Sequence, residues 1–210
     1  MAEIENIKQL GNIPVDYALL RSVFSDYKSP RNKIANLETE GKLIRLKRGL
    51  YVVSPDESQK LLSTELIANH IYGPSYVSME SALKYYGLIR ESVRVLRSIT
   101  TKRSRVFENS ISRFEYINCS EKYYSIGINQ KIDNGYSFLI ASPEKALCDL
   151  IAYTPGVRPR FINALRIFLE DNIRLDMEAF FRMDIDIFKE CAEVGKKKND
   201  LNNLIKILKR

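Results

Sequence analysis

The sequence of 210 residues has no tryptophan, a single histidine and only three cysteines, and this scarcity excludes several kinds of site. A structural zinc centre needs about four Cys or His ligands at close spacing, whereas Cys119, Cys148 and Cys191 lie far apart and His70 stands alone. An odd number of dispersed cysteines also argues against a disulfide framework. We therefore predict three reduced, mostly buried thiols, no bound metal and no cofactor.

Long apolar runs and the motifs of common enzymes are missing as well. No stretch approaches the roughly 18 uncharged apolar residues of a transmembrane helix, and the N-terminal MAEIENIKQL lacks the apolar core of a signal peptide. The chain has no phosphate-binding glycine loop, no HExxH and no nucleophile elbow. These absences favour a cytoplasmic protein that is not an enzyme and does not bind a membrane.

The composition is that of a folded protein with an excess of positive charge. Hydrophobic residues make up 45% of the chain, which is enough for a core. The 33 Lys and Arg against 26 Asp and Glu leave a net charge of +7. This balance favours a polyanionic partner, although the interspersed acidic residues weaken the argument.

One stretch, residues 27–53, combines a short helix with a basic hairpin. Ser29 suits the N-cap and Pro30 the first turn, so we predict a helix from Pro30 to about Glu40, ended by Gly41. Apolar residues then surround a charged, glycine-containing tip, as in a two-stranded hairpin. These residues are Ile44, Leu46, Leu50 and Val52, around the tip Lys47-Arg48-Gly49.

The faces of the helix predict an element that contacts DNA. At about 100° per residue, Ile34 and Leu37 form the buried stripe. The opposite face is small and rich in amides, with basic flanks; it consists of Asn32, Ala35, Asn36 and Thr39, flanked by Arg31 and Lys33. Asn pairs with adenine edges, and Arg or Lys with guanine or phosphate, so this face suits a major groove. A solvated helix with a basic loop is the alternative.

Eight residues of the stretch are assigned to DNA contacts. Between Lys28 and Arg48, seven basic residues stand against two acidic ones. We assign base edges to Arg31, Asn32 and Asn36. We assign phosphates to Lys33, Lys42, Lys47 and Arg48, with the hairpin near the minor groove, and include Arg45 in the same basic surface.

The order of the elements predicts two domains. Helices at residues 2–10 and 14–24 precede the stretch, and three helices with a hairpin are the usual content of a winged helix-turn-helix domain. Ser54-Pro55-Asp56 marks a boundary. We therefore predict a winged helix-turn-helix DNA-binding domain at residues 1–54 and a larger α+β domain at residues 55–210.

The second domain is predicted to contain antiparallel strands flanked by helices. Patterns of period two indicate strands at residues 93–99, 112–117, 123–128 and 136–140. The first helix, with Leu61 facing inward, is followed by six more; the seven span residues 57–71, 79–86, 144–153, 159–170, 176–183, 186–194 and 200–209.

A second basic cluster lies at the start of these strands. Its members outnumber the single acid Glu91 and are Arg90, Arg94, Arg97, Lys102, Arg103 and Arg105. Arg94 and Arg97 fall on opposite faces of a strand, so the cluster does not form one surface. Three interpretations of the cluster stay open: it extends the DNA-binding surface, it binds an acidic partner, or it is a solvated sheet edge.

Asp149 is a carboxylate on an otherwise apolar helical face, and a buried carboxylate needs a partner. We expect a salt bridge to a nearby Arg. The enzymatic alternative is a metal-dependent nuclease that uses Asp149 with Glu80 and Glu144.

Three blocks of the sequence are informative together: GKLIRLKRGLYVV (Gly41–Val53), GPSYVSMESALKYYGLI (Gly73–Ile89) and IASPEKALCDLIAY (Ile140–Tyr153). In this order they resemble the AbiEi antitoxin family of type IV toxin–antitoxin, or abortive-infection, systems. The resemblance implies an N-terminal winged helix that represses its own operon. It also implies a C-terminal domain that neutralises a nucleotidyltransferase-like toxin in phage defence. It places DNA recognition on Arg31, Asn32, Lys33, Asn36, Lys47 and Arg48.

The expected partners are therefore double-stranded DNA of the chain's own promoter and, directly or indirectly, a cognate toxin. The resemblance ends near Arg160 and implies nothing for the residues that follow. The alternative is a stand-alone winged-helix regulator whose second domain senses a ligand or dimerises.

Overall fold

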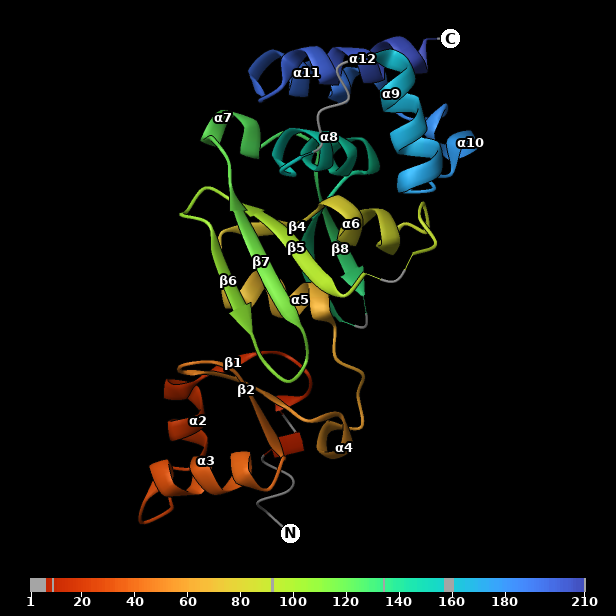
Figure 1. Ribbon diagram of the computed structural model, residues 1–210. Coiled ribbons are helices and arrows are strands. Elements are labelled where there is room, and N and C mark those ends of the chain that lie inside the picture. Colours follow the sequence, from red (N-terminus) through yellow and green to blue (C-terminus); the bar gives the residue numbers. More distant parts are fainter. Residues whose placement is uncertain (1–6, 9, 92, 134, 157–160, 210) are drawn as a thin grey trace.

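Two β-sheets of different size, with helices around them, make up the chain in the computed structural model (Figure 1). The small sheet lies at one end of an elongated molecule, and helices α11 (Ile185–Val194) and α12 (Lys198–Leu208) lie at the other. None of the helices described has both the length and the apolar composition needed to span a lipid bilayer. The structure describes residues 7–8, 10–91, 93–133, 135–156 and 161–209.

The small sheet and two helices form the N-terminal unit. Its elements are β1 (Val15–Asp16), α2 (Tyr17–Val23), α3 (Pro30–Thr39), β2 (Leu43–Lys47) and β3 (Leu50–Val53). The strands are antiparallel in the order β1-β3-β2. Apolar residues of the helices and of one sheet face close a small core: Ile7, Val15, Leu20, Phe24, Ile34, Leu37, Leu43, Tyr51 and Val53.

The predictions for α3 and the hairpin are confirmed. Helix α3 begins at Pro30, and Gly41 follows it with a φ of +73°. The hairpin turns at Arg48 and Gly49, where a φ of +78° requires glycine. Ser29 precedes α3 but makes no side-chain capping bond, contrary to expectation.

The helix predicted at residues 14–24 begins later, at Tyr17. Asp16 is its N-cap, and its carboxylate accepts the Leu19 N–H at 2.7 Å. The residues before it pair with β3 and are therefore strand. Most of the helix predicted at residues 2–10 lies outside the residues that the structure describes.

The larger sheet has six strands. They are β4 (Ser75–Val77), β5 (Val95–Thr100), β6 (Arg105–Glu108), β7 (Arg113–Asn118), β8 (Ile128–Asp133) and β9 (Tyr136–Ala141). Their order is β6-β7-β5-β4-β9-β8. Strand β5 runs parallel to β7 and β4 parallel to β9, whereas the other neighbours are antiparallel. The chain is α+β as predicted, but the prediction of an antiparallel sheet is wrong at these two pairs.

Helices cover both faces of the larger sheet. The helices of this part of the chain are α5 (Thr64–Ile71), α6 (Met79–Tyr85), α7 (Glu121–Tyr124), α8 (Pro143–Tyr153), α9 (Ile162–Ile167), the π-helical turn η1 (Phe168–Asn172) and α10 (Met177–Phe180). The short helix α4 (Pro55–Ser58) lies beside the small sheet (Figure 1). On one face, Tyr116 of β7 donates its hydroxyl to the carbonyl of Ala68 in α5. On the opposite face, α6 brings Glu80 to Arg97 of β5. The helices from α8 onward stack at the end away from the small sheet (Figure 1).

The six-stranded sheet and the helices from α5 onward are called the second unit below. Two predicted elements at or after its start differ from the structure. The helix predicted at residues 57–71 is broken, because Gln59 takes a left-handed φ of 55° after α4, and Leu61 is 87% exposed. The strand predicted at residues 123–128 begins as helix α7, in which Tyr123 is fully buried. Periodicity does not predict strands β4, β6 and β8, because they are too short or too polar to show an apolar period of two.

A buried ion pair connects α8 with β4 and α7. Lys145 and Asp149 have side chains that are 0% exposed, with ammonium and carboxylate 3.3 Å apart. Ser78 and Tyr76 donate hydroxyls to the carboxylate at 2.6 and 3.1 Å, and Lys145 donates to the carbonyl of Tyr123 at 2.8 Å. Burial raises the pKa of Asp149, while Lys145 and the hydroxyls oppose this rise. The partner is thus a lysine one turn away and not the predicted arginine.

The β2–β3 hairpin is buried on both faces and so joins the two units. One face contributes to the small core, as described above. The other face places Leu46, Leu50 and Val52 in the large core, which continues through α5 into the six-stranded sheet. The side-chain amide of Asn109, beyond β6, donates to the carbonyl of Leu46 at 3.0 Å.

Replacing Asp149 with Asn is expected to destabilise the fold by about 3–5 kcal/mol, because the buried Lys145 ammonium loses its opposing charge. Urea denaturation followed by circular dichroism measures the change. The matched control is Glu170→Gln, which breaks an exposed pair with Arg166 and is expected to cost at most about 0.5 kcal/mol. Equal costs for the two variants would contradict the role given to the buried pair.

Leu46→Ala is expected to cost about 2–5 kcal/mol, because it opens a cavity where the hairpin meets the large core. Leu61→Ala, at an exposed position, is the control and is expected to change stability by no more than about 0.5 kcal/mol. The free energy of unfolding of both variants in urea makes the comparison. If both variants behave like the unsubstituted chain, the hairpin does not connect the two cores.

Candidate nucleic-acid interface

Helix α3 lies at one end of the molecule (Figure 1). Ile34 and Leu37 are buried in the small core, as the helical wheel predicts. The opposite face is exposed along its length and consists of Asn32, Ala35, Asn36 and Thr39. The Thr39 hydroxyl donates to the carbonyl of Ala35 at 3.0 Å, so the two asparagines are the long polar side chains of this face.

The basic residues beside α3 differ in how they are held. Arg31 and Arg48 are exposed. Lys33 is half-buried, with its ammonium 5.4 Å from the centre of the Tyr27 ring. Lys42 and Arg45 form ion pairs with the two acids at the end of α3, Glu40 at 2.8 Å and Glu38, respectively.

These ion pairs reduce the positive charge available on the hairpin side of α3. The hydrogen bond to Glu38 is the main cause of the raised pKa of Arg45. Its guanidinium also lies 5.6 Å from the centre of the Tyr51 ring. A phosphate that approaches Arg45 must therefore compete with a carboxylate that is already bound.

Lys47, predicted to bind phosphate, lies against the second unit and not at an isolated hairpin tip. Its ammonium donates to the carbonyl of Ile71, at the end of α5, and lies 6.0 Å from the centre of the Phe107 ring. Burial lowers the pKa of Lys47, and the positive charges of Lys102 and Arg105 add to this effect. The hairpin tip thus lies against the second unit because its outer face is apolar.

The second basic cluster divides into three separate environments. Arg97 forms ion pairs with Glu80 and Glu115 at 2.9 and 3.4 Å. Arg90 and Arg94 lie in the connection between α6 and β5. Lys102, Arg103 and Arg105 lie between β5 and the start of β6 and are exposed.

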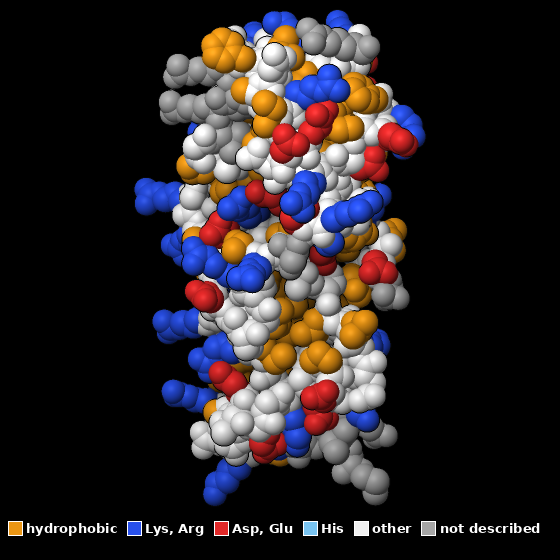
Figure 2. Space-filling view, turned by 45° about the vertical axis from the view of Figure 1, so that its right-hand side comes forward, with side chains coloured by type: hydrophobic (Ala, Val, Ile, Leu, Met, Phe, Trp, Pro, Cys, Tyr) orange, Lys and Arg blue, Asp and Glu red, His pale blue; other side chains and the backbone are white. Residues whose placement is uncertain are grey.

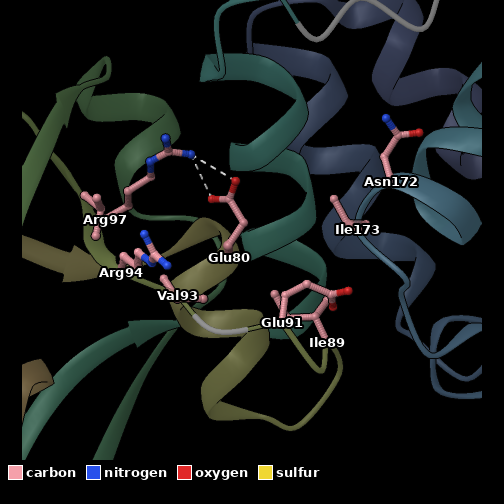
Figure 3. A pocket seen from close by; sticks show the side chains of 9 residues that line it. Glu80, Ile89, Glu91, Val93, Arg94, Arg97, Asn172 and Ile173 are labelled. Atoms are coloured by element: carbon pink, nitrogen blue, oxygen red, sulfur yellow. Dashed lines mark hydrogen bonds and ion pairs between the residues drawn. The ribbon is translucent and has the colours of Figure 1, made fainter.

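Arg94 and Arg97 border a cavity of about 400 Å³ (Figure 3). Ile89, Val93 and Ile173 give it apolar walls, and Asn172 at the end of η1 faces it from the other side. The guanidinium of Arg97 is turned towards Glu80 and is occupied by it. The cavity has a volume typical of small-molecule sites.

Three cations from both units meet at one place, which we call the basic seam: Lys47, Lys102 and Arg105. Lys102 and Arg105 lie over the Tyr72 ring, 5.4 and 5.7 Å from its centre. The Lys102 ammonium also donates to the carbonyl of Gly73. Sequence reasoning does not find the seam, because Lys47 and Lys102 are far apart in the chain and Tyr72 belongs to neither cluster.

The remaining candidate residues lie inside the second unit. The Asp149 carboxylate is occupied by Lys145, Ser78 and Tyr76 and is closed to solvent. Glu144 accepts the N–H of Asp184 at 3.1 Å. Cys119, Cys148 and Cys191 are buried free thiols, as predicted. Within the described part of the chain, no group of His, Cys, Asp and Glu is arranged to hold a metal ion.

No family model matches the sequence, and no curated protein matches it. Among solved structures, the chain is similar to the crystal structure of the RV2827C protein from Mycobacterium tuberculosis, with a TM-score of 0.56 and 10% sequence identity. The match covers 99% of this chain and 79% of that one. At this identity the likeness shows a shared fold alone.

Proposed function

We propose that the chain is a DNA-binding transcriptional regulator whose N-terminal unit is a winged helix-turn-helix. The observation that carries the proposal is the exposed face of α3, which holds Asn32 and Asn36 at one end of the molecule while Ile34 and Leu37 anchor the helix. The element order, two helices followed by a hairpin, is that of winged-helix modules.

In this proposal α3 enters the major groove. Asn32 and Asn36 pair with adenine edges and Arg31 with guanine. The phosphates beside the groove are bound by Lys33, Lys42, Arg45 and Arg48, of which Arg48 is exposed at the hairpin turn. Binding a site in its own promoter makes the chain an autorepressor, because an occupied promoter excludes the polymerase.

We further propose that the chain is the antitoxin of a type IV, AbiE-like pair and that its partner is a nucleotidyltransferase-like toxin. The support is the resemblance of three sequence blocks to the AbiEi family. Two of these blocks pack on each other: Val77 pairs with Ile140 in the sheet, and Tyr76 and Ser78 donate to Asp149. The blocks therefore have a common structural role in the second unit.

The cavity beside Arg94 favours a second candidate, a regulator whose second unit binds a small molecule. Its volume of about 400 Å³ and its apolar walls suit a small ligand. In that case the second unit is a sensor, and the chain has no toxin partner.

The DNA proposal is tested by fluorescence anisotropy with the duplex upstream of the gene, beside a scrambled duplex, at two salt concentrations. The unsubstituted chain is expected to bind the upstream duplex more tightly, with binding that weakens steeply in salt. Asn32→Ala and Asn36→Ala are each expected to lose base contacts. The ratio of the affinities for the upstream and the scrambled duplex should therefore fall roughly 5- to 150-fold, which corresponds to about 1–3 kcal/mol.

The matched control for these variants is Asn129→Ala, an exposed asparagine on β8. It is expected to leave both affinities unchanged. Equal, weak binding of the unsubstituted chain to both duplexes would contradict the proposal. So would asparagine variants of α3 that discriminate as well as the unsubstituted chain.

The antitoxin proposal predicts that the gene beside this one arrests growth when expressed alone and that co-expression of this chain restores growth. A colony-forming assay with both genes under separate promoters measures this. The control is co-expression of the Asp149→Asn chain, whose lower stability is expected to weaken rescue. If the neighbouring gene is harmless, the ligand-responsive regulator takes the place of the antitoxin.

A further inference from the structure

The basic seam is an unusual concentration of positive charge at a junction. Lys47 comes from the hairpin of the N-terminal unit, whereas Lys102 and Arg105 come from the edge of the large sheet. All three contact the same small aromatic group, because the rings of Tyr72 and Phe107 lie 5.7 Å apart.

The acceptors that Lys47 and Lys102 contact are backbone carbonyls. Among the residues described, none of the seam's three cations forms an ion pair, in contrast to Arg45 and Arg97. The acceptors are the carbonyls of Ile71 and Gly73 at the end of α5, where the helix dipole carries a partial negative charge. A partial charge of about half a unit offsets only a small part of three full charges.

The seam retains donors for a ligand. A lysine ammonium has three N–H donors and an arginine five. Lys47 and Lys102 each use one donor on a carbonyl. Arg105 is an exposed residue whose guanidinium lies over the Tyr72 ring. The ring positions the cations by cation–π contact without neutralising them.

Packing like charges together is unfavourable unless a counter-charge relieves the repulsion. Burial lowers the pKa of Lys47, and the positive charges of Lys102 and Arg105 lower it further, as expected for cations this close to its ammonium. An anion with several negative groups at regular spacing relieves this repulsion at more than one cation. The phosphates of a nucleic-acid backbone have this property.

Exposed cations are spread along one edge of the molecule. In Figure 2, Lys and Arg side chains project along the left-hand edge of the molecule, from the end that holds α3 up past the middle. Arg31 and Arg48 of the N-terminal unit and Arg103 beside the seam are exposed as well. Positive charge thus extends from the N-terminal unit onto the second unit.

We infer that the basic seam binds the phosphate backbone of the same DNA duplex whose major groove receives α3; this inference rests on the proposed function. The seam supplies sequence-independent affinity, and α3 supplies discrimination. Because its cations come from both units, a phosphate bound there also bridges the hairpin to the large sheet. The second unit is therefore part of the DNA-binding surface and not only an effector domain.

The test compares Lys102→Gln/Arg105→Gln with Lys206→Gln/Lys209→Gln on the far helix α12, which removes the same charge from exposed positions. Glutamine at position 102 retains a donor for the Gly73 carbonyl. Affinities for the upstream and scrambled duplexes are measured by anisotropy from low to high salt. The slope of log affinity against log salt is expected to become shallower by about 0.9 for each lost phosphate contact.

The seam variant is expected to weaken binding to both duplexes by the same factor, while the ratio between them stays unchanged. The α12 control is expected to keep both the slope and the affinities. Arg105→Gln alone, which removes only a side chain over the Tyr72 ring, is expected to change the slope by about 0.9 and guards against a folding defect in the double variant.

Two results separate the inference from the proposed function. If the unsubstituted chain prefers the upstream duplex but the seam variants keep its slope and affinity, the seam does not contact DNA and the proposed function stands. If the unsubstituted chain shows no preference, the proposed function itself fails. Equal losses in the seam and α12 variants would also overturn the inference, because they would reflect net charge alone.

Discussion

The packing of the β2–β3 hairpin between two cores is the constraint on which the rest of the structure depends. An ordinary hairpin buries one face and exposes the other, so apolar and polar residues alternate along its strands. Here Leu43, Tyr51 and Val53 fill the small core, while Leu46, Leu50 and Val52 join the large one. The hairpin therefore has little freedom to move as a wing, and α3, on the far side of the small core, becomes the end of the molecule.

This arrangement separates two kinds of electrostatic environment. Beside α3, Glu38 and Glu40 form ion pairs with Arg45 and Lys42, so part of the positive charge near the asparagines is already paired. At the seam, by contrast, none of the three cations forms an ion pair within the described residues. Exposed pairs such as those beside α3 add little stability. They occupy Lys42 and Arg45, so that a ligand must displace a carboxylate to reach these side chains. The cations of the seam contact backbone carbonyls and aromatic rings instead.

The second unit depends on a polar contact deep in its interior. Lys145 and Asp149 lie one turn apart on α8 and are surrounded by Tyr76, Ser78 and Tyr123. A buried pair of this kind adds little net stability, but it penalises any packing of α8 that leaves its charges without their polar partners. It thus defines how α8 sits on β4 and α7. The same contact explains why two sequence blocks far apart in the chain share one structural role.

The sequence by itself determined the elements whose signals are local. Pro30 and Gly41 bound α3, the glycine turn defines the hairpin, and the 3.6-residue period separates the buried Ile34 and Leu37 from the exposed asparagines. Only the tertiary structure decided what depends on distant residues: the parallel strand pairs, the helix at Tyr123, the lysine partner of Asp149 and the position of Lys47. The physical reason is that side-chain burial and charge pairing arise between segments far apart in the chain. Propensity and periodicity describe only neighbours along it.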